Sequence, residues 1–270
     1  MPQPVGRRGN PVWLADVLRA TGLDVVEFRG WRRRGHGDFT DIRGVMVHHT
    51  GSDTATAASV AFGSPDLAGP LSQLHIARDG TVTVVAAGVA WHAGAGDYPW
   101  LPANSGNRHT IGVECANSGT SPAAPHRRNW PDAQYLAMVD SCAAILRHLG
   151  RPPGRAIGHK EYAGRAQGKW DPGAIDMDRL RRDIAGRMDI PAAGRDAVLL
   201  RRGSRGPHVA ELQRRLKHAY AAYAGGLRID GVFGAETEAA VREFQRRTPV
   251  LTADGVVGPA TAAALRLRPG

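Results

Sequence analysis

Short apolar runs separated by turn residues predict β-strands through the middle of the chain. The run Val45-Met46-Val47-His48 is apolar and β-branched, which favours a strand. Residues 74–76 and 81–85 flank a turn at Arg78-Asp79-Gly80, so they form two further strand candidates. Residues 111–115 repeat the same apolar, β-rich composition. We therefore expect at least four strands between residues 45 and 115.

Helical spacing takes over after this strand-rich part. Apolar side chains recur on one stripe from Tyr135 to Leu149, with Pro131 suited to the first turn and Gly150 ending the run. The stripe includes Cys142, which we therefore place in the core. A second helix begins near Asp176. Strands interleaved with long helices predict an α/β domain built on an internal sheet.

The first forty residues form a leader segment with a pattern of its own. Asn10-Pro11 reads as a helix cap followed by proline, and apolar residues from Trp13 to Leu18 then fall on one face until Gly22. This predicts a short amphipathic helix packed on the main domain. Residues 31–37, with three consecutive arginines, read as a basic, solvated loop. We place the main domain at 41–188.

The C-terminal part contains an internal repeat. Periodicity lapses around residues 189–197, which we interpret as a linker to a second domain at 198–270. Within it, the segment starting at Asp230-Gly231-Val232 returns 24 positions later at Asp254-Gly255-Val256. Each copy is a glycine-bearing turn that leads into a helix. With an earlier helix around Leu212, the pattern predicts a small all-α domain of three helices.

Composition narrows the classes of function. The chain has 270 residues, 42% of them hydrophobic, so a folded globular protein is expected rather than a disordered one. No apolar stretch is long enough to span a membrane, and the first residues lack the apolar segment of a signal peptide. Cys115 and Cys142 are too few for a disulfide framework and form no C-x-x-C pair, which argues against thiol redox chemistry.

The net charge of +10 predicts an anionic partner. Residues 1–40, 41–194 and 195–270 carry +3, +1 and +6, so the excess lies outside the middle domain. A nucleic-acid binder would be expected to interleave basic and aromatic residues or to carry a groove-reading motif, and neither is found. Charge alone therefore does not identify the partner.

Imidazole and carboxylate groups at separate points of the middle domain are candidates for a metal site. His48 and His49 end a predicted strand, Glu114 lies on another, and His159 and Asp171 lie around a loop. Two histidines and a carboxylate suit Zn²⁺, and a hydrolytic site keeps its fourth position for water. Strand alternation points His48 and His49 to opposite faces, so only one of them can enter such a site.

Five motifs resemble, in order and spacing, the zinc-dependent N-acetylmuramoyl-L-alanine amidases, which are related to the peptidoglycan recognition proteins. The resemblance spans about residues 40–187, and residues 198–267 resemble the peptidoglycan-binding module of wall hydrolases. Residues 9–40 look like the leader of amidase endolysins from phages of actinobacteria. The motifs are Val47-His48-His49-Thr50, Ala90-Trp91-His92-Ala93-Gly94, Ile111-Gly112-Val113-Glu114, Gly158-His159-Lys160 and Lys169-Trp170-Asp171-Pro172-Gly173.

The resemblance implies a central mixed β-sheet flanked by helices and a zinc ion held by His48, His159 and Asp171. His49 is the competing candidate for the first ligand, and we favour His48. Many relatives have cysteine at the third position, whereas this chain has Asp171. Glu114 is implied as the base that activates the zinc-bound water, and Lys169 as the cation near the oxyanion.

The resemblance also suggests substrate-binding residues. His75 lies on the strand where relatives usually carry an aromatic-histidine pair, so we place it in the pocket lining or behind the ligands. Trp91 and His92 are candidates for walls that contact the glycan or the stem peptide, although a tryptophan in an apolar run is more often part of the core.

Four functions are compared on these grounds. We favour a phage endolysin that cleaves the bond between N-acetylmuramic acid and L-alanine. The alternatives are a non-catalytic peptidoglycan recognition protein, a wall peptidase with another scissile bond, and a nucleic-acid binder. We expect a monomer that binds bacterial peptidoglycan, inserts into no membrane, is made in the host cytoplasm without a signal peptide, and reaches the wall after holin-type release.

Overall fold

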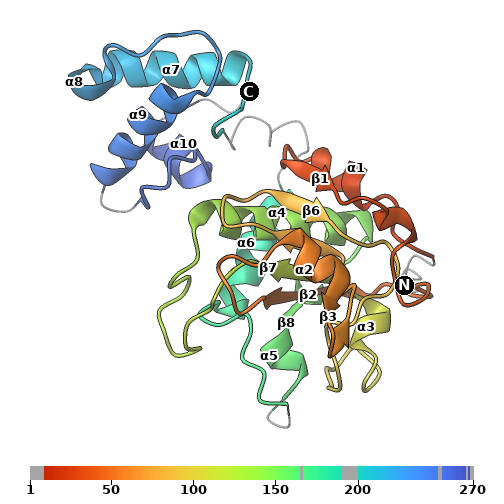
Figure 1. The fold of residues 1–270 in the computed structure, drawn as a ribbon. Coiled ribbons are helices and arrows are strands. Elements are labelled where there is room, and N and C mark those ends of the chain that lie inside the picture. The colour runs from red at the N-terminus through yellow and green to blue at the C-terminus, as the bar shows by residue number, and fades with distance from the viewer. Residues whose placement is uncertain (1–8, 165–166, 190–199, 249–250, 266, 268–270) are drawn as a thin grey trace. The chain divides into compact units, whose positions relative to one another are not determined.

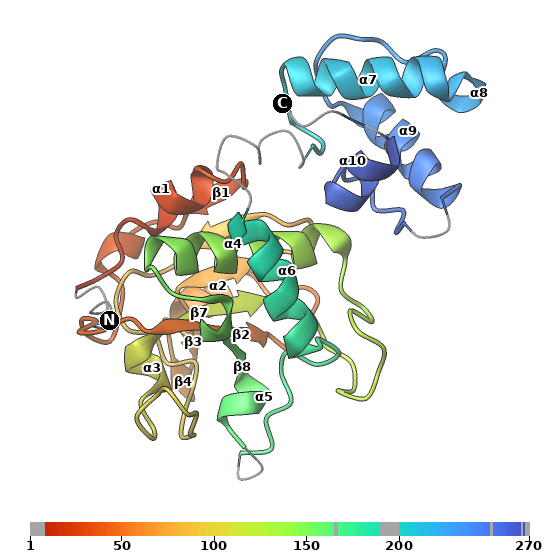
Figure 2. The ribbon, with the colours of Figure 1, turned by 180° about the vertical axis from the view of Figure 1, so that it is seen from behind.

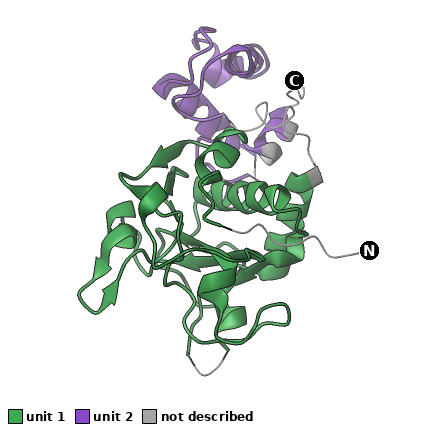
Figure 3. Ribbon diagram, turned by 90° about the vertical axis from the view of Figure 1, so that its right-hand side faces the viewer, with its two compact units in different colours: residues 1–189 green, residues 190–270 purple. Residues whose placement is uncertain are grey.

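The chain forms two compact units, residues 1–189 and 190–270 (Figure 3). The computed structural model describes residues 9–164, 167–189, 200–248, 251–265 and 267. Beyond Asp189, the predicted linker 189–197 lies outside the described residues. Among the described residues, no helix has the length and apolar character needed to cross a membrane. Each unit is described by itself below.

A six-stranded mixed sheet forms the centre of the first unit (Figure 1). Its strand order is β1-β6-β5-β7-β2-β8, in which only β5 and β6 pair antiparallel. The four predicted strands are present, and the two edge strands β1 and β8, three residues each, complete the sheet. The bounds are β1 Val25–Glu27, β2 Gly44–His49, β5 Leu74–Ile76, β6 Val82–Val84, β7 Thr110–Cys115 and β8 Ala156–Gly158.

Helices cover the sheet. The long helices α4 (Asp132–His148) and α6 (Met177–Asp189) pack on each other, and α1 (Leu14–Arg19) packs on α4. Figures 1 and 2 show α4 and α6 on one side of the sheet and α2 on the other. The predicted α/β class is confirmed. The short elements are α2 Ala57–Phe62, α3 Gly106–His109, α5 His159–Tyr162, the 3-10 helices Trp31–Arg33 and Pro153–Arg155, and the hairpin strands β3 Gly63–Ser64 and β4 Leu67–Ala68.

A buried ion pair joins the two long helices. Asp140 of α4 and Arg187 of α6 approach to 2.9 Å, and both side chains are less than 10% exposed. The apolar stripe of α4 packs beside them, with Met138, Cys142 and Leu146 buried. The placement of Cys142 in the core is therefore confirmed, and burial raises the pKa of its thiol to about 12.

The leader segment differs in two details from the sequence expectation. Asn10 does not cap α1; its side chain donates to the Asp38 carboxylate at 2.5 Å and accepts the N–H of Phe39 at 3.2 Å. Residues 31–37 are not simply a solvated loop, because Trp31 is buried in a 3-10 helix and Arg34 donates to the Val85 carbonyl. The Arg34 contact and the buried Trp31 join the leader segment to the rest of the first unit.

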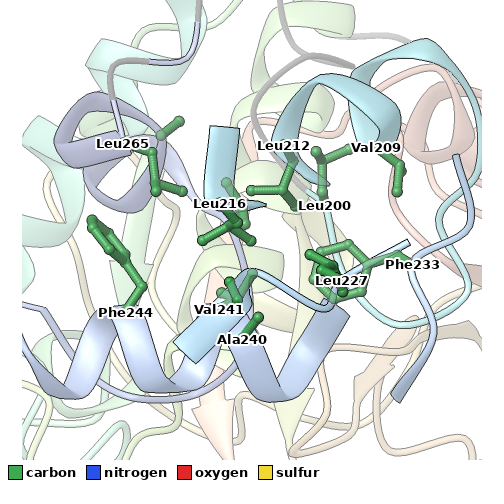
Figure 4. Packing of buried hydrophobic residues seen from close by; sticks show 13 residues of the cluster. Leu200, Val209, Leu212, Leu216, Leu227, Phe233, Ala240, Val241, Phe244 and Leu265 are labelled. Atoms are coloured by element: carbon green, nitrogen blue, oxygen red, sulfur yellow. The ribbon is translucent and has the colours of Figure 1, made fainter. Parts of the chain in front are cut away.

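The second unit contains helices α7 (Pro207–Ala219), α9 (Ala235–Arg246) and α10 (Pro259–Leu265), with the short α8 (Ala221–Ala224) after α7. The three predicted helices are present, and the single turn of α8 is additional. Apolar side chains from all of them form one core (Figure 4). Burial of such a core is the main favourable term in the folding of a small helical unit.

Two glutamines organise the internal repeat of the second unit. The Gln213 amide donates to the Asp230 carboxylate and the Val232 carbonyl, and its oxygen accepts the N–H of Gly231. In the second copy, Gln245 makes the same set of bonds to residues 254–256. Each glutamine also donates to the threonine that follows in its copy. The repeat is therefore a repeated turn held by a buried amide.

Candidate functional site

Polar side chains meet where parallel strands of the sheet end. His48 is the fifth residue of β2, Glu114 the fifth of β7, and His159 directly follows β8 (Figure 1). These three strands run parallel, so their carboxyl ends lie at the same edge of the sheet. Asp171 reaches this edge from the connection between α5 and α6. The topology thus brings together residues that are up to 123 positions apart.

His48, His159 and Asp171 form a compact cluster of ligand atoms. The Oδ2 atom of Asp171 lies 2.9 Å from His48 Nδ1 and 3.1 Å from His159 Nδ1, and the two Nδ1 atoms lie 3.2 Å apart. The side chain of His48 is 1% exposed and that of Asp171 13%. Among the described residues, these three alone form a cluster of metal-ligand type.

The protonation of the cluster suits a cation. Burial lowers the pKa of His48 to about 4, so its imidazole is neutral at pH 7. Burial raises the pKa of Asp171, but the facing His159 and His48 rings outweigh this effect and hold that pKa well below its usual range, so the carboxylate is ionised. His159 Nε2 faces the Ala93 carbonyl at 3.0 Å and donates to it, so Nδ1 is the atom that can bind a metal. The residues therefore fit a divalent metal such as Zn²⁺.

His49 takes no part in this cluster. Its ring lies 4.5 Å from that of Trp170, and its Nδ1 accepts the N–H of Gly173 at 3.2 Å. Alternation along β2 points it away from the face that carries His48. Of the two candidates for the first ligand, the structure brings His48 to His159 and Asp171.

Glu114 lies beside the cluster without bonding to it. Its position pairs with His48 on β2 and with His75 on β5, so the three side chains leave the same face of the sheet. The Oε2 atom is buried and has no hydrogen-bond partner among the described residues. Burial, reinforced by the Asp171 charge, raises the pKa of Glu114 well above its usual range, and Lys169 acts in the opposite direction. A buried carboxyl group with a raised pKa and a free oxygen is a candidate for proton transfer.

Lys169 is exposed and precedes Asp171 by two residues. Its charge lowers the pKa of both His48 and Glu114, which places the ammonium within electrostatic range of both groups. The role of Lys169 as the cation near the oxyanion stays a prediction.

The three expected substrate contacts have different positions. Trp91 is 46% exposed and stacks on His36 of the leader at 3.6 Å, so it is available to a ligand. His92 is buried, and its nitrogens face His48 Nε2 and the Thr110 carbonyl. His75 is also buried and donates to the Ala55 carbonyl at 3.0 Å. For His75 the buried position agrees with a place behind the ligands, one of its two expected positions, whereas His92 was expected as a wall that contacts the substrate.

Two contributors to the site could not be found by sequence reasoning. The Ala93 carbonyl contacts His159, and the Asn107 side chain accepts the backbone N–H groups of His92 and Ala93 at 2.9 and 2.7 Å. A backbone carbonyl leaves no trace in a sequence, and one asparagine in a segment without periodicity is no signal by itself.

Two parts of the chain match known protein families. Residues 38–174 match the family model described as N-acetylmuramoyl-L-alanine amidase, and residues 205–265 match the model described as a putative peptidoglycan binding domain. A search of curated proteins found no match. The first family match includes the five residues His48, Glu114, His159, Lys169 and Asp171.

Several solved structures are similar to this chain. The endolysin amidase LysCS of Clostridium intestinale has 14% identity, covers 59% of this chain and 94% of its own, and has a TM-score of 0.43. The amidase AmiD of E. coli, solved with anhydro-N-acetylmuramic acid-L-Ala-D-gamma-Glu-L-Lys, has 19% identity, covers 89% and 95%, and has a TM-score of 0.43. The N-terminal domain of SleB has 41% identity, covers 25% and 88%, and has a TM-score of 0.23.

Proposed function

Because the chain belongs to the family of N-acetylmuramoyl-L-alanine amidases, we propose that His48, His159 and Asp171 bind one zinc ion, at which the chain cleaves the bond between N-acetylmuramic acid and L-alanine. The observation that carries the metal assignment is the convergence of three possible ligand atoms within 3.2 Å of one another. Two imidazole nitrogens and a carboxylate oxygen lie this close when a proton or a metal cation is shared between them.

Zinc bound there would lower the pKa of a coordinated water to about 7 and polarise the amide carbonyl. The chain's own residues then move the protons. Glu114, whose Oε2 has no partner in the described part of the chain, takes a proton from the attacking water. The same carboxyl group passes a proton to the departing amine of L-alanine, which would otherwise leave as a very poor anion.

Lys169 supplies positive charge on the solvent side of the cluster. A cation at this position stabilises the negative charge that develops on the carbonyl oxygen during attack. Its exposure leaves the ammonium free to meet a substrate that arrives from solution. We assign Trp91, which is also exposed, to contact with the substrate, and we place His75 and His92 behind the reacting groups.

We propose that the second unit binds the enzyme to bacterial peptidoglycan. Its match to a peptidoglycan-binding model supports bacterial peptidoglycan as the partner. Its charge of +6 suits the acidic polymers of the bacterial wall. We propose that the chain is a monomeric phage endolysin, made in the host cytoplasm and released to the wall through a holin-type pore.

Zinc analysis of the purified chain tests the metal assignment. We expect one zinc per chain in the wild type and none retained by Asp171→Ala, because that variant loses the only anion of the ligand set. His49→Ala is the matched control, since this neighbouring histidine contacts Trp170 instead of the cluster, and it should keep one zinc. Full zinc in Asp171→Ala, or its loss in His49→Ala alone, would contradict the ligand assignment.

A further inference from the structure

The segment His92–Ala93 lies behind the metal cluster and contacts both of its histidines. His92 Nδ1 lies 3.0 Å from His48 Nε2, and the Ala93 carbonyl lies 3.0 Å from His159 Nε2. In each case the contact is made to the ring nitrogen that does not face Asp171. One short segment thus contacts two rings, one on β2 and the other at the start of α5.

The hydrogen bonds of His92 determine which nitrogen of His48 carries the proton. His92 Nε2 faces the Thr110 carbonyl at 3.2 Å, and because a carbonyl only accepts, this nitrogen must carry hydrogen. The neutral His92 ring then has a bare Nδ1, which can only accept. His48 Nε2 must therefore donate to it, which leaves the lone pair of His48 Nδ1 directed at Asp171.

The opposite arrangement of His48 would block the metal site. With its proton on Nδ1, His48 would donate to Asp171 Oδ2 at 2.9 Å, and the atom needed by a metal would be occupied by hydrogen. Its bare Nε2 would then face the bare Nδ1 of His92 at 3.0 Å, which is repulsive. The His92 ring is thus the group that disfavours the closed form of the site.

Asn107 holds this segment in place. Its Oδ1 accepts the backbone N–H of His92 at 2.9 Å and that of Ala93 at 2.7 Å. The two residues are thereby fixed at the point where one offers its ring to His48 and the other its carbonyl to His159. Among the described residues, no other side chain bonds to both N–H groups.

We propose that His92 and Asn107 are positioning residues that preform the metal site, His92 by setting the tautomer of His48 and Asn107 by fixing the segment that orients both histidines. The inference rests on the zinc site proposed above and assigns to this segment a role distinct from substrate contact. Loss of such partners behind a metal ligand typically weakens metal affinity about 10–100-fold.

Two measurements on the full chain test the inference. The first is zinc affinity by competition with a chromophoric chelator, for the wild type, His92→Phe, His92→Asn and Asn107→Ala. Phenylalanine keeps the ring without the acceptor, whereas asparagine can place an oxygen where Nδ1 stood. His109→Phe is the matched control, because the His109 ring also bonds to a backbone carbonyl and lies outside the cluster. The second is the His48 tautomer in the zinc-free chain, from ¹⁵N spectra of histidine-labelled protein.

We expect zinc affinity to fall about 10–100-fold in His92→Phe and in Asn107→Ala, to recover in part in His92→Asn, and to stay within twofold in His109→Phe. We also expect His48 to carry its proton on Nε2 in the wild type and on Nδ1 in His92→Phe. Unchanged affinity in folded His92→Phe, or a wild-type His48 protonated on Nδ1, would overturn the inference. Because the His48 tautomer is measured in the zinc-free chain, this measurement tests the inference even if the proposed amidase mechanism is wrong.

Discussion

His48 and Glu114 occupy paired positions on the adjacent parallel strands β2 and β7, so their side chains leave the same face of the sheet. His48 turns its Nδ1 to His159 and Asp171, whereas Glu114 bonds to none of these three and keeps a buried Oε2 without a partner in the described residues. The pairing therefore separates two roles: one residue of the pair can hold a metal, and the other remains available to a proton.

Glu114→Gln should remove turnover while keeping the metal. The amide cannot take a proton, so we expect kcat to fall by about 10²–10⁴, the range typical of a lost general base. Zinc content should stay at one per chain, because Glu114 is outside the ligand cluster. Hydrolysis of a soluble muropeptide and metal analysis of the same sample check both points.

The control for this variant is Glu27→Gln. Glu27 lies on the edge strand β1, where it pairs with Arg19 and Arg32, and its loss should leave kcat unchanged. Turnover of Glu114→Gln within a few-fold of the wild type would remove Glu114 from the mechanism.

Lys169→Met should shift the pH dependence of the enzyme. The Lys169 charge lowers the pKa of Glu114, so its removal raises that pKa further above the usual carboxyl range. Since the base must be ionised to accept a proton, the acidic limb of kcat/KM should move to higher pH, and kcat should fall at every pH. Lys169→Arg keeps the charge and should keep the limb in place. A profile of Lys169→Met that coincides with the wild type would contradict the electrostatic role.

Local pattern and strand order explain which parts of this fold could be predicted from the sequence. The stripe from Tyr135 to Leu149 gave α4, and the β-branched run at Val45 gave β2, because periodicity and side-chain shape act locally. The edge strands β1 and β8 were not predicted, because each is three residues long and is defined by its pairing with β6 or β2. The Asn10-Pro11 pattern predicts a cap, because a capping asparagine and one that contacts residues 38–39 look the same in sequence.

The site residues were predicted mainly from the order and spacing of the five motifs, and less from the chemistry of the individual side chains. Alternation along β2 separated His48 from His49 but could not say which one meets His159 and Asp171. The expectation that His92 contacts substrate did not allow for its two hydrogen bonds behind His48. Such bonds depend on how loops fold over the sheet, which no local pattern encodes.

Asp140→Ala should strongly destabilise the first unit. It leaves the Arg187 guanidinium buried without its carboxylate, which typically costs about 3–5 kcal/mol. Asp178→Ala is the control, because this carboxylate pairs with Arg181 at the surface, is 79% exposed, and should contribute less than about 1 kcal/mol. Denaturant unfolding of both variants measures the difference. Equal effects of the two substitutions would show that burial of the pair does not matter.

Gln245→Leu should loosen the second unit and separate wall retention from catalysis. The leucine leaves the N–H of Gly255 and the Val256 carbonyl without the amide that bonds them, a loss of about 1–3 kcal/mol. Sedimentation with purified walls should then decrease, whereas hydrolysis of a soluble muropeptide should not, because the metal cluster lies within the other unit. The equivalent Gln213→Leu should behave alike. If Gln245→Leu unfolds the second unit and wall binding does not decrease, the second unit has no role in wall retention.

The most direct test of the central claim is the identity of the bond that the zinc-loaded chain cleaves. Purified peptidoglycan is digested with the wild type and with Glu114→Gln, and the new end groups are identified by mass spectrometry. We predict new L-alanine amino termini together with intact N-acetylmuramic acid for the wild type, and neither for Glu114→Gln. New amino termini elsewhere in the stem peptide, or no cleavage by a zinc-loaded wild type, would contradict the account.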